Sequence, residues 1–394
     1  QTGKVTAVAV GKATITATAA NGTAGKYTVT VEPHTHDFDD DGICKTCGNK
    51  KLLMSGGTIN NKDILTAYTD WSNSVKEVVI PEGVKGIGKS AFQGNSVLES
   101  VTIPDSVTSI GESAFFQCKS LKNVNMGKGV TSIGKSAFSY TALESVTIGD
   151  SVEIIEDYAF YPCNNLKNIT LPASVKKIGL EFTAFQMPLN QTATVTYKGT
   201  LKQWCAVDSM QSFVIFSQSM VLEGENNFDL KIATELKIPD GVTKIGKSAF
   251  FGCQKLEKVT IPASVTEIGA NAFANCIFLT DVAIPDNVTS IGVNAFYACS
   301  FTSMKIPDSV TSIGAYVFDK CNRLKEVTIG NGITEIGEGA FNDCNSLETV
   351  TYNGTEKQWK AIKGINDIGL LGRTTVTVSG GKTLTYNSST KKWE

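Results

Sequence analysis

Apolar and polar positions alternate along this chain in one pattern that repeats every 22 or 23 residues. The unit that starts at Leu98 reads L-x-x-V-x-I-P-x-S-V-x-x-I-G-x-x-A-F-x-x-C and ends at Cys118. Its first apolar run ends in a two-residue alternation, which is typical of a strand with one buried face, and proline or glycine then ends that strand. A second short apolar pair follows, and Ser-Ala-Phe turns the chain back toward the next unit. The phenylalanines of the units are Phe92, Phe115, Phe138 and Phe160, then Phe250, Phe273, Phe296, Phe318 and Phe341.

No single unit of this size can bury its own apolar side chains, so neighbouring units must stack. Stacking places successive strands about 4.8 Å apart in one parallel sheet. The period lies within the range of leucine-rich repeats. The pattern therefore predicts a leucine-rich-repeat solenoid, horseshoe-like α/β but mostly β. We expect a parallel sheet on one face, short turns or helices on the other, and the repeated phenylalanines in the core.

The same pattern resembles the BspA-type leucine-rich repeat of bacterial surface proteins, and the resemblance extends from about residue 75 to residue 360. It implies a right-handed solenoid that a host-associated bacterium secretes or displays on its surface. Some members of that family are adhesins that bind host matrix proteins. The resemblance therefore also implies an adhesin-like role outside the cell.

Seven of the ten cysteines share one place in the unit, three residues after the phenylalanine: Cys118, Cys163, Cys253, Cys276, Cys299, Cys321 and Cys344. Asn95 and Thr141 occupy the same place in two other units, and neither can form a disulfide. Cysteine is small and is often buried without reacting. We therefore expect free thiols beneath a tight turn rather than the disulfide framework that ten cysteines otherwise suggest.

The repeat fails between Phe185 and about Leu236, which divides the units into two blocks. The interruption contains Y-K-G-T-L-K-Q-W, ending at Trp204, and Y-N-G-T-E-K-Q-W recurs after the second block, ending at Trp359. Thr-x-x-Gln is a capping-box pattern, so each copy is expected to start a short helix. The open end of a repeat block needs a cover. We expect each tryptophan to supply one, and carbohydrate stacking is the alternative role.

The first 33 residues alternate threonine with small apolar residues, in runs that include 3–8, 13–18 and 27–31. They resemble the closing strands of a bacterial immunoglobulin-like domain, and because a whole sandwich needs about seven strands we expect the natural protein to extend upstream. Ser379-Gly-Gly-Lys382 predicts a hairpin near the other end. The predicted parts are immunoglobulin-like strands (1–33), a Cys/His linker (34–50), an N-terminal cap (51–74), the first block (75–190), an interrupting cap (191–231), the second block (232–351) and a C-terminal cap (352–394).

One segment carries metal-ligand chemistry. His34 and His36, the only histidines of the chain, lie close before Cys44-x-x-Cys47. Two imidazoles and two thiolates are a complete tetrahedral set for zinc, so we predict a possible structural zinc site and no other cofactor. Two alternatives remain. The segment is a plain linker, with or without a local disulfide, or its Asp-x-Asp-x-Asp-Gly run opens a calcium loop, although Gly48 then stands where that loop needs an acidic ligand.

Composition argues against several function classes. The formal net charge is -2, which gives no basic field for nucleic acid. No stretch approaches the roughly 18–20 apolar residues of a membrane span. Both histidines lie outside the repeats, and no phosphate-binding glycine motif precedes a helix, so neither a hydrolytic triad nor a nucleotide site is expected. We therefore expect a monomeric protein that is not an enzyme.

In L-x-x-V-x-I, two positions of each strand must face outward. A flat surface of hydroxyls and amides without aromatic or arginine anchors favours a large contact of modest affinity. We expect it to bind an extracellular host protein. The alternative is a glycan-binding or purely architectural spacer module of a larger surface protein. The candidate binding residues are Ser100, Thr102, Asn123, Asn125, Ser145, Thr147, Asn168, Thr170, Lys258 and Thr260.

Overall fold

The structure is a computed structural model that describes residues 11–18, 24–31, 57–59, 64–68, 75–179, 193–209, 217–370, 374–387, 390 and 392–394. The chain forms two compact units, Gln1–Leu53 and Met54–Glu394. In the first unit, β1 (Gly11–Thr18) pairs antiparallel with β2 (Ala24–Val31). Two of the three expected runs are therefore strands, whereas residues 3–8 lie outside the described residues. The immunoglobulin-like domain stays a prediction.

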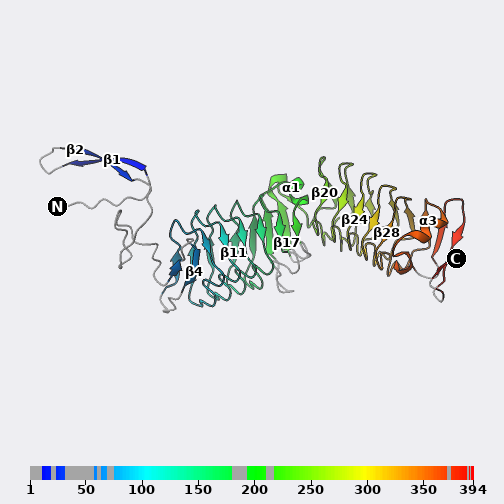
Figure 1. The fold of residues 1–394 in the computed structure, drawn as a ribbon, viewed down its shortest axis with the longest axis horizontal. Coiled ribbons are helices and arrows are strands. Elements are labelled where there is room, and N and C mark those ends of the chain that lie inside the picture. Colours follow the sequence, from blue (N-terminus) through cyan, green and yellow to red (C-terminus); the bar gives the residue numbers. More distant parts are fainter. Residues whose placement is uncertain are drawn as a thin grey trace. The chain divides into compact units, whose positions relative to one another are not determined.

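The second unit confirms the mostly-β parallel solenoid, which has about 12 turns. The first strands of the coils, together with strands of the interruption and of the C-terminal cap, lie side by side along the unit (Figure 1). In the first block, they are β5 (Glu77–Val79), β7 (Ser100–Thr102), β9 (Asn123–Asn125), β11 (Ser145–Thr147) and β13 (Asn168–Leu171), and the interruption adds β15 (Ala193–Tyr197). They continue with β17 (Ser217–Leu222), β19 (Glu235–Lys237), β21 (Lys258–Thr260), β23 (Asp281–Val282), β25 (Ser303–Ile306), β27 (Glu326–Ile329), β29 (Thr349–Tyr352) and β30 (Thr375–Val378).

A second strand of two residues follows in the same coil, so the solenoid has two layers of parallel strands where the sequence predicted one. Most of these second strands end in a buried isoleucine, and in most units a turn glycine follows it. In the first block they are β6 (Gly86–Ile87), β8 (Ser109–Ile110), β10 (Ser132–Ile133), β12 (Ile154–Ile155) and β14 (Lys177–Ile178), and the interruption adds β16 (Asp208–Ser209). In the second they are β20 (Lys244–Ile245), β22 (Glu267–Ile268), β24 (Ser290–Ile291), β26 (Ser312–Ile313) and β28 (Glu335–Ile336).

The third side of each coil, here called the Phe side, is a tight turn around the repeated phenylalanine. Ser113 and Gln117 flank Phe115 in left-handed backbone conformations, with φ of 55° and 59°. This alternation turns the peptide groups along the solenoid axis, so that the Phe115 N–H donates to the Ala137 carbonyl of the next coil at 2.7 Å. The turn therefore extends the ladder of hydrogen bonds between coils to the third side.

The phenylalanines form two stacks inside the solenoid, as predicted. Phe92 and Phe115 have ring centroids 4.8 Å apart and ring planes within 10° of each other, and Phe273 and Phe296 lie 5.5 Å apart at 4°. Phe273 has no exposed surface. Stacked rings bury large apolar areas at the coil spacing, so each stack is a continuous apolar contact between successive coils.

The cysteines under the Phe side are free and buried, which confirms the expectation from their spacing. The Cys118 thiol donates to the Phe92 carbonyl of the preceding coil at 3.1 Å. The two residues that replace cysteine at this position make different hydrogen bonds. The Thr141 hydroxyl donates to the carbonyl of Phe138 at 2.8 Å, and the Asn95 side chain accepts from the Leu98 N–H at 3.1 Å. A small polar group is thus required here, and a disulfide partner is not.

The interruption contains the predicted helix α1 (Leu201–Cys205), and its near copy contains α3 (Glu356–Ala361). Both begin at a complete capping box, Thr200 with Gln203 and Thr355 with Gln358. Their tryptophans have no exposed surface, so stacking of a carbohydrate on either ring, the alternative role, is wrong. The burial agrees with packing inside the solenoid end.

The first copy also makes hydrogen bonds to the second block, which the sequence did not predict. The Trp204 indole donates to the carbonyl of Ala249, and the Cys205 carbonyl accepts from the Gly246 N–H at 2.7 Å. Ala249 and Gly246 belong to the first coil of the second block. The helix therefore joins the two blocks as well as covering the first, and the predicted boundaries of this segment stay a prediction.

Hairpins lie at both ends of the second unit. β3 (Gly57–Ile59) and β4 (Ile64–Tyr68) pair antiparallel, and β4 then pairs with β6. At the other end, β30 and β31 (Thr383–Leu384) pair antiparallel, which confirms the hairpin predicted at Ser379–Lys382. A last pair, β32 (Tyr386–Asn387) and β33 (Lys392–Trp393), follows. Among the described residues, no helix is long and apolar enough to cross a membrane.

Candidate binding surface

Eight of the ten candidate binding residues form two in-register patches on the outward side of the first strands. Ser100 pairs with Asn123 and Thr102 with Asn125 across β7 and β9. The same arrangement recurs between β11 and β13. All eight side chains are exposed or half-buried, since the inward positions between them face the core. We call them the polar strip: Ser100, Thr102, Asn123, Asn125, Ser145, Thr147, Asn168 and Thr170.

The side chains of the polar strip carry no charge and make no hydrogen bond to any described part of the protein. Their backbone groups complete the ladder, for example from the Ser100 N–H to the Lys76 carbonyl at 3.0 Å. The hydroxyls and amides themselves keep their hydrogen-bonding capacity for water or a ligand. The strip is thus a flat surface of unused donors and acceptors.

The remaining two candidates, Lys258 and Thr260, lie on β21 in the second block. Both are exposed. The Lys258 ammonium lies 3.0 Å from the Asp281 carboxylate of the next coil, so its charge is partly compensated. β15, β17 and the interruption separate β21 from the polar strip. The structure therefore does not unite all ten candidates in one surface.

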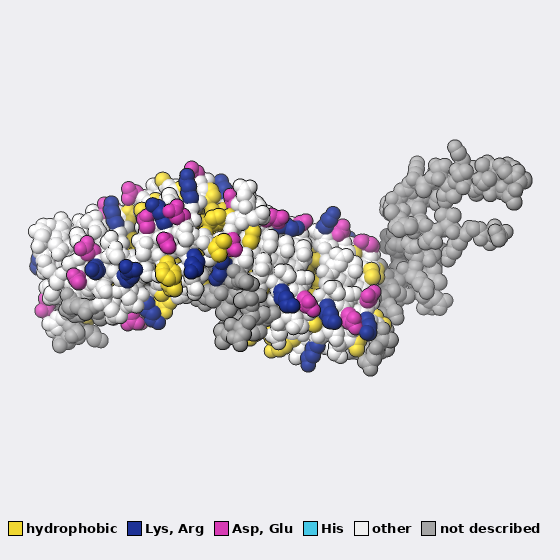
Figure 2. All heavy atoms as spheres, turned by 180° about the vertical axis from the view of Figure 1, so that it is seen from behind, with side chains coloured by type: hydrophobic (Ala, Val, Ile, Leu, Met, Phe, Trp, Pro, Cys, Tyr) yellow, Lys and Arg dark blue, Asp and Glu magenta, His cyan; other side chains and the backbone are white. Residues whose placement is uncertain are grey.

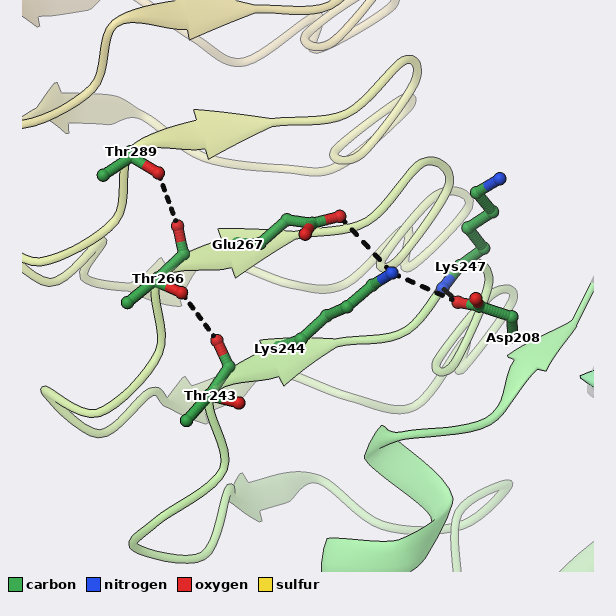
Figure 3. A network of polar contacts seen from close by, with 7 residues as sticks. All are labelled: Asp208, Thr243, Lys244, Lys247, Thr266, Glu267 and Thr289. Atoms are coloured by element: carbon green, nitrogen blue, oxygen red, sulfur yellow. Dashed lines mark hydrogen bonds and ion pairs between the residues drawn. The ribbon is translucent and has the colours of Figure 1, made fainter. Parts of the chain in front are cut away.

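Polar side chains of the second-strand layer bond to the protein itself (Figure 3). The Thr266 hydroxyl donates to the Thr243 carbonyl of the preceding coil, and the Thr289 hydroxyl donates to the Thr266 carbonyl, both at 3.1 Å. Beside this ladder, the Lys244 ammonium lies between the carboxylates of Asp208 and Glu267, at 3.6 and 3.5 Å. This face stabilises the stack and the junction between the blocks, and it offers a ligand fewer unused groups than the polar strip.

Opposite charges on the solenoid surface are interspersed. Figure 2 shows lysine or arginine and acidic side chains side by side on one face, without a large field of one sign. Pairs between coils contribute to this mixture, for example Lys76 with Glu99 at 2.8 Å and Lys176 with Glu153 at 2.7 Å. Such exposed pairs each stabilise the fold by about 0–1 kcal/mol. This face therefore gives no electrostatic preference for a strongly charged partner.

Exposed apolar side chains escaped the sequence interpretation. Tyr140 on the Phe side, packed edge-on against Phe116, is 48% exposed. Phe278, in the turn that precedes β23, is 53% exposed. Phe278 holds a position that is polar in most other units, for example Lys255 and Arg323, and this is the signal that could have marked it. The place of Tyr140 is taken by glycine, proline or alanine in several units, so the sequence carries no such signal there. These single side chains offer contact points outside the polar strip.

The repeats match a known family. A model described as BspA type leucine rich repeat region matches residues 65–191 and 224–348, in 6 copies, which together make up more than half of the chain. The chain belongs to the BspA-type leucine-rich repeat family. No curated protein matches it.

Solved structures of bacterial leucine-rich repeat proteins are similar to this BspA-type chain. A leucine rich cell surface protein from Faecalibacterium prausnitzii is 28% identical, over 79% of this chain and 97% of its own, with a TM-score of 0.45. The pneumococcal vaccine antigen PcpA is 20% identical, over 84% of this chain and 93% of its own, with a TM-score of 0.54. A leucine-rich repeat protein from Bacteroides ovatus is 22% identical, over 83% and 99%, with a TM-score of 0.36. The likeness to PcpA shows the shared fold.

Membership in the BspA-type family sets the class of function. BspA-like leucine-rich-repeat proteins are typically surface-associated, and the family indicates no catalytic function. A repeat-based binding or spacer module is consistent with this family. The predicted metal ligands His34, His36, Cys44 and Cys47 lie outside the described residues, so zinc binding stays a prediction.

Proposed function

We propose that this protein is a non-catalytic module of a bacterial surface that binds an extracellular host protein through the polar strip. The observation that carries the proposal is the difference between the two strand layers. Threonines of the second layer donate to carbonyls of neighbouring coils, whereas the hydroxyls and amides of the polar strip make no hydrogen bond to the described part of the protein. A surface of free donors and acceptors on a rigid sheet can bind a partner without paying to break internal hydrogen bonds.

The chemistry of the strip sets the expected affinity. Tight protein interfaces concentrate their binding energy in tryptophan, tyrosine and arginine, and the strip contains none of them. A single contact should therefore be weak. Many copies on one cell would raise the overall avidity by a factor of about 10²–10⁴ when several contacts engage together. The proposal thus suits a surface-displayed protein better than a soluble one.

A second candidate function uses the same surface. Hydroxyl and amide side chains also suit the hydroxyls of a glycan, so the strip could bind an extended polysaccharide. A spacer that binds nothing and only displays other domains is the third outcome. The three are separated by one measurement, because each predicts a different result with defined ligands.

The test is a solid-phase binding assay of the whole chain against purified host matrix proteins and against polysaccharides. The double variant Thr102→Lys and Thr147→Lys adds a long charged side chain to each patch of the strip. The control is Gln93→Lys with Gln117→Lys, two exposed positions on the Phe side. Lysine is tolerated there, since Lys320 already holds the place equivalent to Gln117 with the same φ of 59°.

Saturable binding to a protein that the strip variant loses and the Phe-side control retains would support the proposal. Saturable binding to polysaccharides alone, lost in the strip variant, would support the glycan-binding function instead. Equal binding by both variants would exclude the strip as the contact surface. If the wild-type chain binds none of the purified ligands, the result would favour the spacer function.

A further inference from the structure

The layer of first strands is interrupted where the two blocks meet. After β17 the chain turns back through the short helix η1 (Glu223–Glu225) into β18 (Phe228–Asp229), which pairs antiparallel with β17. The chain then starts the next coil at β19, which pairs with β21 on one side and forms the edge of its sheet on the other. Hydrogen bonding also lapses between β9 and β11 and between β23 and β25. Within the described residues, β18 is the one antiparallel strand that lies at such a break in the layer of first strands.

The open edge of β19 leaves two backbone groups without a partner among the described residues. In the next coil, the Lys258 N–H donates to the Thr234 carbonyl at 3.1 Å, and the Thr260 carbonyl accepts from the Ile238 N–H at 3.0 Å. These bonds attach each coil to the one before it. The corresponding groups of β19 are the Glu235 N–H and the Lys237 carbonyl, and neither has a bond of this kind. β19 therefore exposes the edge that elsewhere pairs with the preceding coil, and no first strand pairs with it there.

A cavity of about 370 Å³ lies along this edge. Its apolar lining comes from Leu201 of α1, Phe228 of β18 and Leu236 of β19. Glu235 and Lys237 line it with opposite charges, and neither has an ion pair within the described part of the chain. The neighbouring charges are already engaged, because Glu225 accepts from the Leu201 N–H at 3.0 Å and Lys258 lies beside Asp281.

We propose that this cleft binds an extended peptide segment of a partner protein, which adds to β19 as a parallel strand. Strand addition needs an unpaired edge for affinity and a pocket for specificity, and both are present here. In a parallel register, the side chain beside Glu235 is basic and the one beside Lys237 is acidic. The residue between them points inward, where the apolar lining fits a leucine, isoleucine or valine. The expected motif is basic–apolar–acidic.

This site differs from the polar strip in both place and chemistry. It recognises main-chain groups on one strand edge, whereas the strip offers side chains on four strand faces. The two proposals therefore fail separately, since the Thr102 and Thr147 variants leave the β19 edge unchanged.

The test uses the full chain and a phage-displayed library of random nonapeptides. Selection is made on the wild-type chain, with removal of phage that bind Glu235→Pro. Proline deletes the Glu235 N–H at the first residue of an edge strand, where it is tolerated. Alanine removes the same side chain and keeps the N–H, so the pair isolates the main-chain group. Synthetic copies of the enriched peptides are then measured by fluorescence anisotropy.

We expect enriched peptides with the basic–apolar–acidic motif that bind Glu235→Pro at least tenfold more weakly than Glu235→Ala. We also expect slower amide hydrogen exchange in the β19 segment when peptide is bound. A second measurement does not depend on the folding of any variant: N-methylation of the peptide amide that faces the Lys237 carbonyl should abolish binding to the wild-type chain. Failure to enrich peptides, equal binding to both variants, or binding that survives N-methylation would each overturn the proposal.

Discussion

The thiol of Cys276 donates a hydrogen bond to the carbonyl oxygen of Phe250, which lies in the preceding coil, at 3.2 Å. The same bond recurs from Cys299 to Phe273 at 3.3 Å. Each of these carbonyls also accepts a backbone N–H within its own turn, for example from Cys253 to Phe250 at 3.3 Å, so the thiol adds a second hydrogen bond that joins one coil to the next. The repeated cysteine is therefore a small donor that connects coils, and its reactivity should be low.

The buried thiols should not react with alkylating agents in the folded protein. Burial raises the pKa of Cys118 and of Cys344 to about 12, so only a trace of the reactive thiolate exists at pH 8. We expect iodoacetamide to leave these cysteines unmodified under native conditions and to modify them fully in denaturant, as measured by peptide mass spectrometry. Labelling of Cys276 in the folded protein at the rate of a free thiol would contradict the burial of the repeated cysteines.

The same thiols should make the protein less stable in alkali. The pKa of Cys118 rises from its ordinary value of 9.0 to about 12 in the folded state, because burial disfavours the thiolate. Between these values the folded chain holds a proton that the unfolded chain has lost, so the free energy of unfolding falls as pH rises. One thiol accounts for a slope of about 1.4 kcal/mol per pH unit. Cys118→Ser, which keeps a donor but does not ionise, should show a correspondingly shallower slope in urea unfolding between about pH 9.5 and 11.

Much of the fold follows from the repeat period alone. The 22- or 23-residue spacing of the phenylalanines placed them in the core, because only stacking can bury an apolar set that recurs at that interval. The capping boxes at Thr200 and Thr355 were also readable, since their side-chain bonds are local. Local patterns and strict periods are the features that a single sequence carries most directly.

Features that depend on the neighbouring coil could not be predicted. Ser290-Ile291 is too short to show the alternation of a strand, and it becomes β24 only because Glu267-Ile268 and Ser312-Ile313 lie beside it. The open edge of β19 likewise arises because β18 runs backward, and nothing in the sequence of Glu235–Lys237 marks it. The polar strip was readable as outward-facing, but the absence of internal bonds to it was not.

Phe273 lies in the middle of the second stack, so its removal should leave a cavity that the neighbouring rings cannot fill. We expect Phe273→Ala to lower the free energy of unfolding by about 3–5 kcal/mol in urea titrations. Phe278→Ala is the matched control, because the Phe278 side chain is half exposed and its loss should change stability by less than about 0.5 kcal/mol. Equal effects of the two substitutions would show that the stack does not carry the stability of the block.

The Cys/His segment should bind one zinc ion per chain if its four residues act as ligands. We expect elemental analysis of the purified full chain to find zinc, and Cys44→Ser to lose it, because three ligands of this set hold the ion far more weakly. Intact-mass measurement distinguishes a linker with a local disulfide, since formation of a Cys44–Cys47 disulfide removes two hydrogen atoms from the chain. Zinc absent from both proteins would exclude the metal site, and bound calcium would favour the aspartate loop.

Trp204 and Trp359 share a sequence motif and full burial, and they differ in one hydrogen bond. The Trp204 indole N–H donates to the Ala249 carbonyl at 2.8 Å, whereas the Trp359 indole nitrogen is buried without a partner among the residues that the structure describes. Replacement by phenylalanine removes similar volume at both sites, but only at Trp204 does it strip a buried carbonyl of its donor. We expect Trp204→Phe to lower the free energy of unfolding by about 1 kcal/mol more than Trp359→Phe, which removes an unsatisfied buried group at the same time as it creates a cavity.

Because the lost bond joins the blocks, Trp204→Phe should also separate the urea unfolding transitions of the two blocks. Hydrogen exchange measured in each block follows these transitions. If both variants unfold as the wild type does, in one transition, then the contact at Ala249 does not couple the two blocks.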